Sequence, residues 1–581
     1  MTVSTLNRRS FFRKLGNHKT TVERKGIFGK TNPLLPTKEQ ELPPVPPPAT
    51  AITLLGGLDP YTGPWGYEQA AHLLRRTTFG LRKQDVELLL TMTMDQAVDY
   101  ILNVPAGPPP PPLNNYFNGD PDNPDGYEDP NVPLGQTWVD ADYDEDAEGL
   151  RIESFRGWWV DLMINQEANI REKMTLFWHN HFATQSEAVF YGKTNYQHNA
   201  KLRANALGNF KELTRIVTLD PMMLYYLNGY LNTAQAPDEN YARELQELFT
   251  IGKDTPQGYT EDDVVAAARV LTGWRINPVP SQTFFSPAEH DFQDKQFSAF
   301  YNNTIIPGSI DGGAELDALL DMIFAKEEVS LHLCRKLYRW FIYYNVDANV
   351  EQNVIVPLAQ IFRDNNFDIK PVLDVLLRSE HFFDALNKGC FIKTPLDLIV
   401  GTLRSFNLTI PASTPWDQLV MQYILSVLLS DQQMLPGNPP NVAGWQAFRQ
   451  SPQYYRIWIN GDTARNRSIF TDAMTVPGIE TTNDLLKIDH IAFASQFDDP
   501  SNPNKLVDDM VRLLLPQPIS QTKKTLLKSI LLTGLPNDSY WTAAWYEYIN
   551  DPGNQMAFDA VNLRLTFLHN YLLKLPEYQL A

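Results

Sequence analysis

The sequence predicts a mainly α-helical protein, built as a large multi-helix single body with long loops and at most a small β-hairpin insert. Three observations support this fold class. Apolar residues recur at helical spacing along most of the chain, residues that start helices precede several of these runs, and no repeat of fixed period occurs. With 581 residues, of which 43% are hydrophobic, the chain can bury a large core.

Residues 1–50 are expected to lie outside this body as a disordered basic and proline-rich segment. Arg8 and Arg9, followed by Phe11 and Phe12, resemble a twin-arginine export signature. The apolar segment of about 7 to 15 residues that such a signal requires does not follow. A periplasmic or cell-envelope location is therefore expected, and a cytoplasmic location stays open. The prolines of 33–48 predict an extended spacer.

Helix signals then follow in order along residues 51–581. Gly80 is placed to end a first helix. Asp220 before Pro221 predicts a helix start, and Thr260 with Asp263 resembles a capping box. Further helices are predicted at 155–163, 316–324, 330–344, 354–363, 369–377, 396–406, 418–429, 505–515, 523–532 and 556–573. Residues 284–301 form the best site for a small hairpin or irregular insert.

Composition excludes several classes of protein. Lys and Arg number 49 and Asp and Glu number 68, for a net charge of −19, so a nucleic-acid partner is not expected, because its phosphates would be repelled. No apolar run approaches the roughly 20 residues of a membrane-spanning helix, so an integral membrane protein is not expected either. Two cysteines, Cys334 and Cys390, cannot supply a disulfide framework or a cysteine-rich zinc module.

An acidic loop is expected at about 114–149. Asp120, Asp122 and Asp125 offer hard oxygen ligands of the kind that calcium prefers. The segment does not match an EF-hand, because Pro124 occupies the third ligand position and no glutamate closes the loop. A solvated acidic loop is the favoured interpretation, and a calcium site is the weaker alternative.

Five side chains suggest a metal site. His179 and His181 lie two residues apart; in a continuous helix they would point about 200° apart, whereas an extended chain after His179 would let both bind one ion. Glu244 and Glu247 are three residues apart and share one helix face. Together with His290, these side chains would suit a divalent transition metal such as zinc, iron or manganese.

The same residues also suit acid/base chemistry. In that hypothesis His181, Glu244 and Glu247 are the catalytic residues of a hydrolytic step. Three neighbouring polar residues would contact substrate or orient the ligands. They are Asn240, Arg243 and Asp291.

A structural interpretation stands beside each of these hypotheses. His181 continues an apolar stripe with Met174, Phe177 and Trp178 and can be a core histidine. Glu244 and Glu247 can be an exposed face or can pair with arginines. Likewise, the tryptophans of 441–458 can form a sugar platform or part of the helical core.

Several long segments resemble the bacterial domain-of-unknown-function family 1800, and the resemblance extends from about residue 67 to residue 581. The segments that carry it include FWHNHF at 177–182 and NYARELQELFTIG at 240–252. The other matching segments are 71–80, 258–274, 290–291, 334–341, 393–396, 439–445 and 575–580.

The resemblance implies a protein without an established reaction. Similar proteins often carry export signals and are often encoded beside an exported protein whose fold resembles alkaline phosphatase, which is the partner that we expect. Family members commonly have histidine where this chain has Phe249. The expectation is an exported or envelope-associated protein that is either a metal-dependent or acid/base hydrolase of a surface polymer or, alternatively, a non-catalytic scaffold or assembly subunit.

Overall fold

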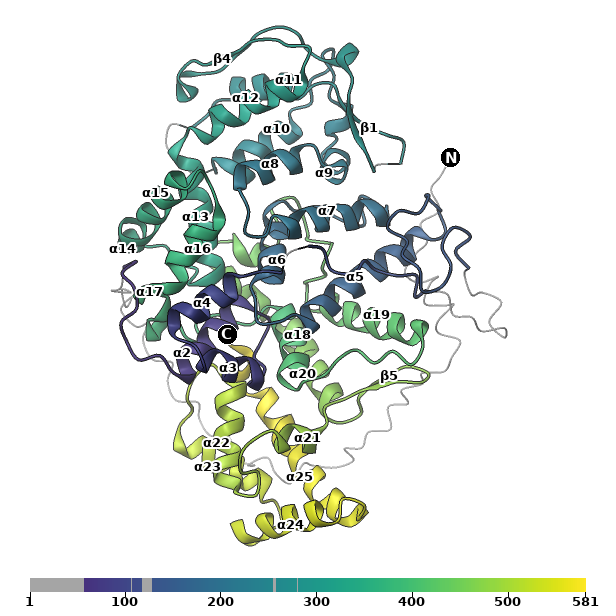
Figure 1. Cartoon of the computed structure of the whole chain (residues 1–581), viewed down its shortest axis with the longest axis vertical. Helices are drawn as coiled ribbons and strands as arrows, with labels where there is room; N and C mark the ends of the chain where they lie inside the picture. The colour runs from purple at the N-terminus through teal and green to yellow at the C-terminus, as the bar shows by residue number, and fades with distance from the viewer. Residues whose placement is uncertain (1–56, 106, 117–127, 254–257, 280) are drawn as a thin grey trace. The chain divides into compact units, whose positions relative to one another are not determined.

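The computed structural model describes residues 57–105, 107–116, 128–253, 258–279 and 281–581 (Figure 1). Helices dominate these residues, which confirms the mainly α class. The expectations for 1–50 and for the candidate calcium ligands at 120–125 lie outside the described residues.

The α-helices begin and end close to the predicted positions in most segments. They are α2 (Tyr67–Thr77), α3 (Lys83–Leu90), α4 (Met94–Leu102), α5 (Glu148–Asn165), α6 (Arg171–His181), α7 (Gly192–Ala204), α8 (Phe210–Thr218), α9 (Pro221–Tyr226), α10 (Asn240–Glu244), α11 (Glu261–Val270), α12 (Gly312–Phe324), α13 (Glu327–Phe341), α14 (Ala348–Val350), α15 (Val356–Asp364), α16 (Ile369–Arg378), α17 (Glu380–Phe383), α18 (Pro395–Ser405), α19 (Pro415–Asp431), α20 (Gly461–Thr475), α21 (His490–Ser495), α22 (Pro503–Leu514), α23 (Gln521–Leu531), α24 (Asp538–Asn550) and α25 (Gln555–Lys574).

Two π-helical segments and several 3₁₀ turns join the α-helices. The π-helices are η2 (Leu245–Thr250) and η5 (Glu351–Ile355). The 3₁₀ turns are η1 (Gly229–Leu231), η3 (Pro287–Glu289), η4 (Ala299–Tyr301), η6 (Ala385–Asn387), η7 (Gln446–Phe448), η8 (Tyr454–Trp458) and η9 (Pro576–Gln579). The π-helix η2 continues directly from α10 and includes part of the NYARELQELFTIG segment.

Three antiparallel strand pairs are present among the described residues, where the sequence predicted at most one hairpin. They are β1 (Trp274–Ile276) with β2 (Thr283–Phe285), β3 (Lys295–Gln296) with β4 (Ile305–Ile306), and β5 (Ile479–Glu480) with β6 (Leu485–Leu486). The first two pairs bracket the predicted insert at 284–301. Because each strand has only two or three residues, the alternation that signals a strand is too short to detect.

The core forms around α5 and α6. Phe155, Trp159 and Met163 of α5 are buried, as their spacing predicted. In α5, Arg151 is also buried, where it pairs with Asp129 at 2.9 Å and with Glu148 at 2.9 Å. Such a fully paired buried arginine costs little when both carboxylates stay in place, but losing either partner would leave an uncompensated charge.

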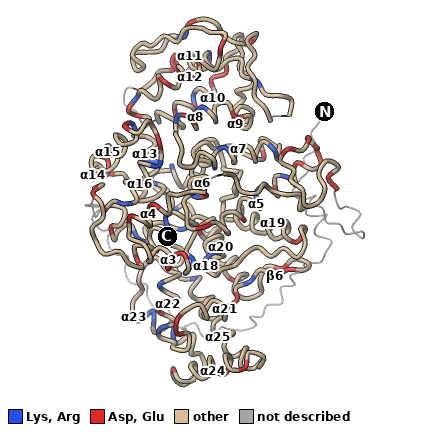
Figure 2. The backbone as a smooth tube through the Cα atoms, in the orientation of Figure 1, with Lys and Arg blue, Asp and Glu red and all other residues tan. Residues whose placement is uncertain are grey.

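Several helices far apart in sequence pack on this core. α5 contacts α7, α18 and α19, and α6 contacts α7. At the yellow end of the colour range, α25 contacts α20, α21, α23 and α24 (Figure 1). Acidic and basic residues are spread over the described chain (Figure 2). Within the described ranges, no helix has both the length and the apolar character that crossing a bilayer requires.

Candidate functional site

His181 is the last residue of α6 and links this helix to the π-helix η2. Its Nε2 lies 3.1 Å from the carbonyl oxygen of Phe249, and its Nδ1 lies 3.0 Å from Nζ of Lys336. Because Nε2 must donate to the carbonyl, Nδ1 is the acceptor for the lysine. Burial and the nearby Lys336 hold the pKa of His181 well below 6.5. Both ring nitrogens therefore have structural partners.

His179 points in a different direction from His181. The helix continues through both residues, so their side chains are about 200° apart, and the alternative in which the chain extends after His179 is wrong. The His179 ring lies edge-on to Trp159 and Trp445, with centroid distances of 5.2 and 5.8 Å. Its Nε2 has no hydrogen-bond partner among the described residues. Burial, with a smaller effect of His198, lowers the pKa of His179 to about 3.

Glu244 and Glu247 lie near the surface, at the junction of α10 and η2. Burial raises the pKa of Glu244, and the neighbouring Glu247 raises it further. Glu247 pairs with Lys253 at 2.7 Å and approaches Arg243 at 4.0 Å. Arg243 itself binds Glu261 at 2.6 Å. The two carboxylates are close to each other, but basic side chains of their own segment surround Glu247.

Asn240 supports the same segment. Its side-chain amide donates to the carbonyl oxygen of Leu227 at 3.2 Å, which ties the start of α10 to the end of α9. Asn240 thus stabilises a helix junction in this structure.

His290 and Asp291 belong to a separate buried ion-pair cluster. His290 Nδ1 lies 2.8 Å from the carbonyl oxygen of Thr272, and Nε2 lies 3.0 Å from Glu315 Oε1. Lys295 binds the other Glu315 oxygen at 2.6 Å. Burial alone would raise the pKa of Glu315, but the hydrogen bonds from His290 and Lys295 lower it. Asp291 pairs with Arg269 at 2.7 Å.

The predicted residues do not form one site. Among the residues that the structure describes, no three His, Cys, Asp or Glu side chains gather in the arrangement of a metal site. His181 binds a carbonyl and a lysine, His290 binds Glu315, and Glu247 binds Lys253. Because His181, Glu247 and His290 each bind partners in their own regions, these side chains do not assemble the shared ligand set predicted from the sequence.

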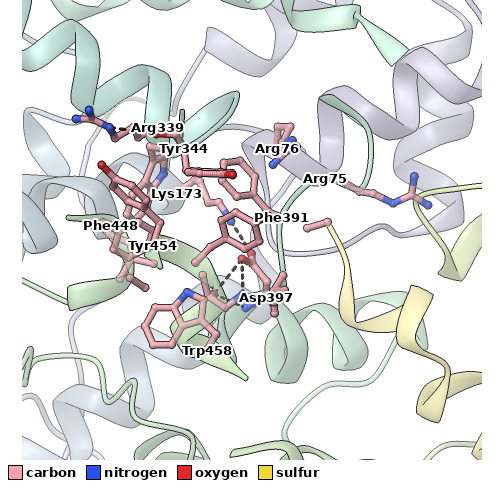
Figure 3. A pocket seen from close by; sticks show the side chains of 17 residues that line it. Arg75, Arg76, Lys173, Arg339, Tyr344, Phe391, Asp397, Phe448, Tyr454 and Trp458 are labelled. Carbon is pink, nitrogen blue, oxygen red and sulfur yellow. Dashed lines mark hydrogen bonds and ion pairs between the residues drawn. The ribbon is translucent and has the colours of Figure 1, made fainter. Parts of the chain in front are cut away.

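A pocket lies elsewhere, among α2, α6, α13, α18 and the turns η7 and η8 (Figure 3). The cavity itself measures about 50 Å³ and opens into a wider space of about 640 Å³ that includes bulk solvent. The lining residues are Arg75, Arg76, Lys173, Leu176, Arg339, Trp340, Tyr344, Phe391, Ile392, Thr394, Asp397, Ala447, Phe448, Tyr454, Tyr455, Trp458 and Ala581.

Positive charge dominates the lining of this pocket. Lys173 is paired with Asp397 at 2.5 Å. Arg75, Arg76 and Arg339 form no ion pair with any carboxylate in the described part of the chain. Arg75 points toward the C-terminal end of α22 and donates to the carbonyl oxygens of Arg512, Leu513 and Leu515, the closest at 2.9 Å. In Figure 3, Arg75 and Arg339 lie on opposite sides of Asp397.

Two nitrogen donors in the lining are buried and have no acceptor among the described residues. They are Nε of Arg76 and Nε1 of Trp340. Arg76 uses one of its other nitrogens to donate to the carbonyl oxygen of Asn387 at 2.5 Å, and its guanidinium lies 4.4 Å from the centroid of the Phe391 ring. A buried donor without a hydrogen-bond partner lowers the folding stability of a protein. A ligand that supplies an acceptor to Arg76 or Trp340 would remove this penalty.

Aromatic rings form the rest of the wall. Trp340 lies 4.4 Å from Phe448, and Phe391 lies 5.3 Å from Tyr455, measured between ring centroids. Trp458 is buried, so the tryptophan proposed from the sequence as a sugar platform lies in the wall of the pocket and is largely covered. Flat faces and cations together suit a ligand that has both a ring and a negative charge.

A close contact between α6 and the 441–445 loop positions the aromatic wall. Asn180 accepts a hydrogen bond from the backbone of Trp445 at 2.9 Å. Gly444 has φ +79°, and a Cβ atom at this position would lie 2.3 Å from Oδ1 of Asn180. Glycine is therefore required for the loop to reach α6.

The sequence-based search for chemistry did not identify this pocket. It concentrated on histidines and acids, whereas the pocket depends on Arg76, Arg339 and Trp340. A usable signal was present: these residues lie in 71–80 and 334–341, two of the segments that carry the family resemblance. Clustered arginines are also conspicuous in a chain with net charge −19.

Comparison with known proteins gives one match. The family model described as "Protein of unknown function (DUF1800)" matches residues 72–580. No curated protein and no solved structure matches the chain significantly. Since the match covers nearly the whole described body, the chain belongs to the DUF1800 family.

Proposed function

We propose that the protein binds a small anionic ligand that carries a ring, such as a sugar phosphate or an acidic sugar, in the pocket beside α13. The observation that carries this proposal is the set of arginines without carboxylate partners. Arg76 and Arg339 line a hollow in which the one acidic side chain among the described lining residues, Asp397, is already paired with Lys173. Positive charge left unpaired in a cleft attracts an anion.

The charge of the whole chain limits the size of this ligand. With net charge −19, the protein would repel a long polyanion beyond the pocket itself. A free sugar phosphate, or a single acidic terminal unit of a surface polymer, fits this constraint. The aromatic wall of Trp340, Phe391 and Phe448 would contact the ring of the ligand while the arginines bind its charge.

Binding of probe ligands to the purified protein, measured by isothermal titration calorimetry, tests this proposal. The probes are inorganic phosphate, a hexose phosphate, galacturonate and neutral glucose. We expect the hexose phosphate or galacturonate to bind and glucose to bind at least tenfold more weakly. Binding of none of the charged probes, or equal binding of glucose, would contradict the proposal.

Two arginines of α13 provide a matched pair of variants. Arg339→Gln removes a pocket charge, whereas Arg335→Gln, one helical turn away, removes an arginine that pairs with Glu351. We expect Arg339→Gln to weaken binding about tenfold or more, since charge-assisted hydrogen bonds contribute about 1.5–3 kcal/mol. Arg335→Gln is expected to leave binding unchanged.

The envelope location is part of the same proposal, and the pair Arg8-Arg9 supports it. Fractionation of the native bacterium, with an Arg8→Lys/Arg9→Lys variant for comparison, tests it. Accumulation of the wild type in the periplasm, and of the variant in the cytoplasm, is the expected result. An equal distribution of the two proteins would contradict twin-arginine export.

A further inference from the structure

Helix α25 exposes a row of apolar side chains. Met556, Leu563, Phe567 and Tyr571 are 80, 53, 44 and 39% exposed. Their spacing of seven, four and four residues places them along one side of the helix. The opposite side, which includes Val561, Leu565 and Leu572, is buried in the body. An exposed apolar row on a helix whose other side is already buried is typical of a surface that binds a partner protein.

Two exposed charged side chains flank this row, while Arg564 of the same helix is half-buried. Asp559 lies near the start of the helix and Lys574 is its last residue, and both side chains are exposed. Within the exposed row, only the apolar residues Leu563, Phe567 and Tyr571 lie between them. Phe567 is close to the midpoint of 559 and 574.

From this pattern we infer that α25 pairs with α25 of a second copy of the chain, antiparallel, about a two-fold axis beside Phe567. In that arrangement Phe567 meets its own counterpart, and Leu563 meets Tyr571 of the other copy. Asp559 then lies next to Lys574 of the other copy, so the opposite ends of the row attract each other. Two-fold pairing of one patch with itself is the commonest way in which soluble proteins form oligomers.

The composition of the surface agrees with such an interface. Charged residues are depleted at the centre of protein interfaces and aromatic residues are enriched. Phe567 and Tyr571 occupy the central and C-terminal part of the row. α24, which packs against α25, exposes Tyr546 and Ile549 as well, at 53 and 48%. Lys574 also pairs with Asp472 of its own chain at 2.6 Å, and this partly exposed ammonium group can still donate to a second carboxylate.

Disulfide trapping tests the geometry directly. In Phe567→Cys the two introduced thiols would face each other across the axis, so mild oxidation should yield a covalent dimer in high proportion. In Met556→Cys the thiols would be about 33 Å apart, since each lies eleven residues from the axis at 1.5 Å per residue, well beyond disulfide reach. Both positions are exposed, so neither substitution should disturb folding. Equal cross-linking of both variants, or of neither, would overturn the antiparallel pairing.

Sedimentation equilibrium tests the association itself. The wild type should dimerise, and Phe567→Glu should raise the dimer dissociation constant at least 30-fold. Ile310→Glu, at an exposed position in the 307–311 loop, is the matched control and should dimerise like the wild type. A wild type that stays monomeric up to about 100 µM would overturn the inference. This test does not involve the ligand pocket.

Discussion

The ammonium group of Lys336 lies 3.0 Å from Nδ1 of His181 and 3.0 Å from the carbonyl oxygen of Leu248. One side chain of α13 therefore holds both the end of α6 and the π-helix η2. His332, one turn earlier on α13, donates to the same carbonyl oxygen at 3.1 Å. These contacts give His181 of the FWHNHF segment a structural role: it donates to the carbonyl of Phe249, which lies at the end of η2, where helix carbonyls have no partner within the helix.

His181→Ala should therefore destabilise the protein. The carbonyl of Phe249 and the ammonium of Lys336 would each lose a partner, and a buried cavity would form. The expected loss is about 2–4 kcal/mol of unfolding free energy, measured by urea denaturation. An unchanged unfolding midpoint would contradict the structural role and would return His181 to consideration as a catalytic residue.

Stability should decrease in mild acid because of buried histidines. His490 Nδ1 lies 2.7 Å from His569 Nδ1, and burial lowers the pKa of His490 to about 4. In the unfolded chain a histidine binds its proton near pH 6.5. Between about pH 4 and 6.5 the unfolded state thus binds more protons, so the unfolding free energy falls as the pH falls, by about 2 kcal/mol per such group from pH 7 to 5.

A His490→Gln variant separates this effect from general destabilisation. It should be less stable than the wild type at pH 7, because the contact with His569 is lost, but its unfolding free energy should fall less steeply toward pH 5. Urea denaturation of both proteins at the two pH values gives the comparison. Parallel losses in the two proteins would show that His490 does not titrate with unfolding.

Trp340→Phe should weaken ligand binding without weakening the fold. The substitution keeps an aromatic ring in the pocket wall and removes the buried Nε1 donor that has no acceptor in the described chain. We expect about a tenfold loss of affinity for the charged probe, equivalent to one hydrogen bond, with an equal or higher melting temperature. Trp274→Phe removes a comparable unpaired donor away from the pocket and should leave affinity unchanged.

Gly444→Ala should disturb both stability and binding. The residue has φ +79°, and an added Cβ would collide with Asn180, so a loss of about 2–4 kcal/mol is expected. Gly461→Ala is the control, because nothing lies within 4 Å of its Cβ position and alanine reduces the entropy of the unfolded chain. Equal melting temperatures for the two variants would contradict the close loop–helix contact.

The local part of this structure was predictable from the sequence. The capping box of Thr260 and Asp263 is present, and Asp220 caps α9 by accepting from the backbone of Met222. These hydrogen bonds join residues two or three positions apart, so the residues that predict each cap are also the residues that form it. The buried state of Trp445 also agrees with the core interpretation.

The candidate site was not predictable in the same way. His179 and His181 carry the residue types of a metal site, but the helix separates them and their surroundings supply other partners. No short stretch of the sequence indicates the pocket, because Arg76 and Trp340 line it only when α2 and α13 pack together. The exposed apolar row of α25 was likewise not predictable. Helical periodicity identifies the apolar sides of a helix, but it does not show which side packs against the rest of the protein.

The sequence separation of the pocket residues has a consequence for biosynthesis. Its walls come from residues as far apart as Arg75 and Trp458, and Ala581 completes its edge. A growing polypeptide can form α2 and α6 early, but it has no binding site until the segments beyond residue 440 have left the ribosome and docked. Nascent chains and truncated products that lack these segments would thus be unable to capture the ligand that we propose.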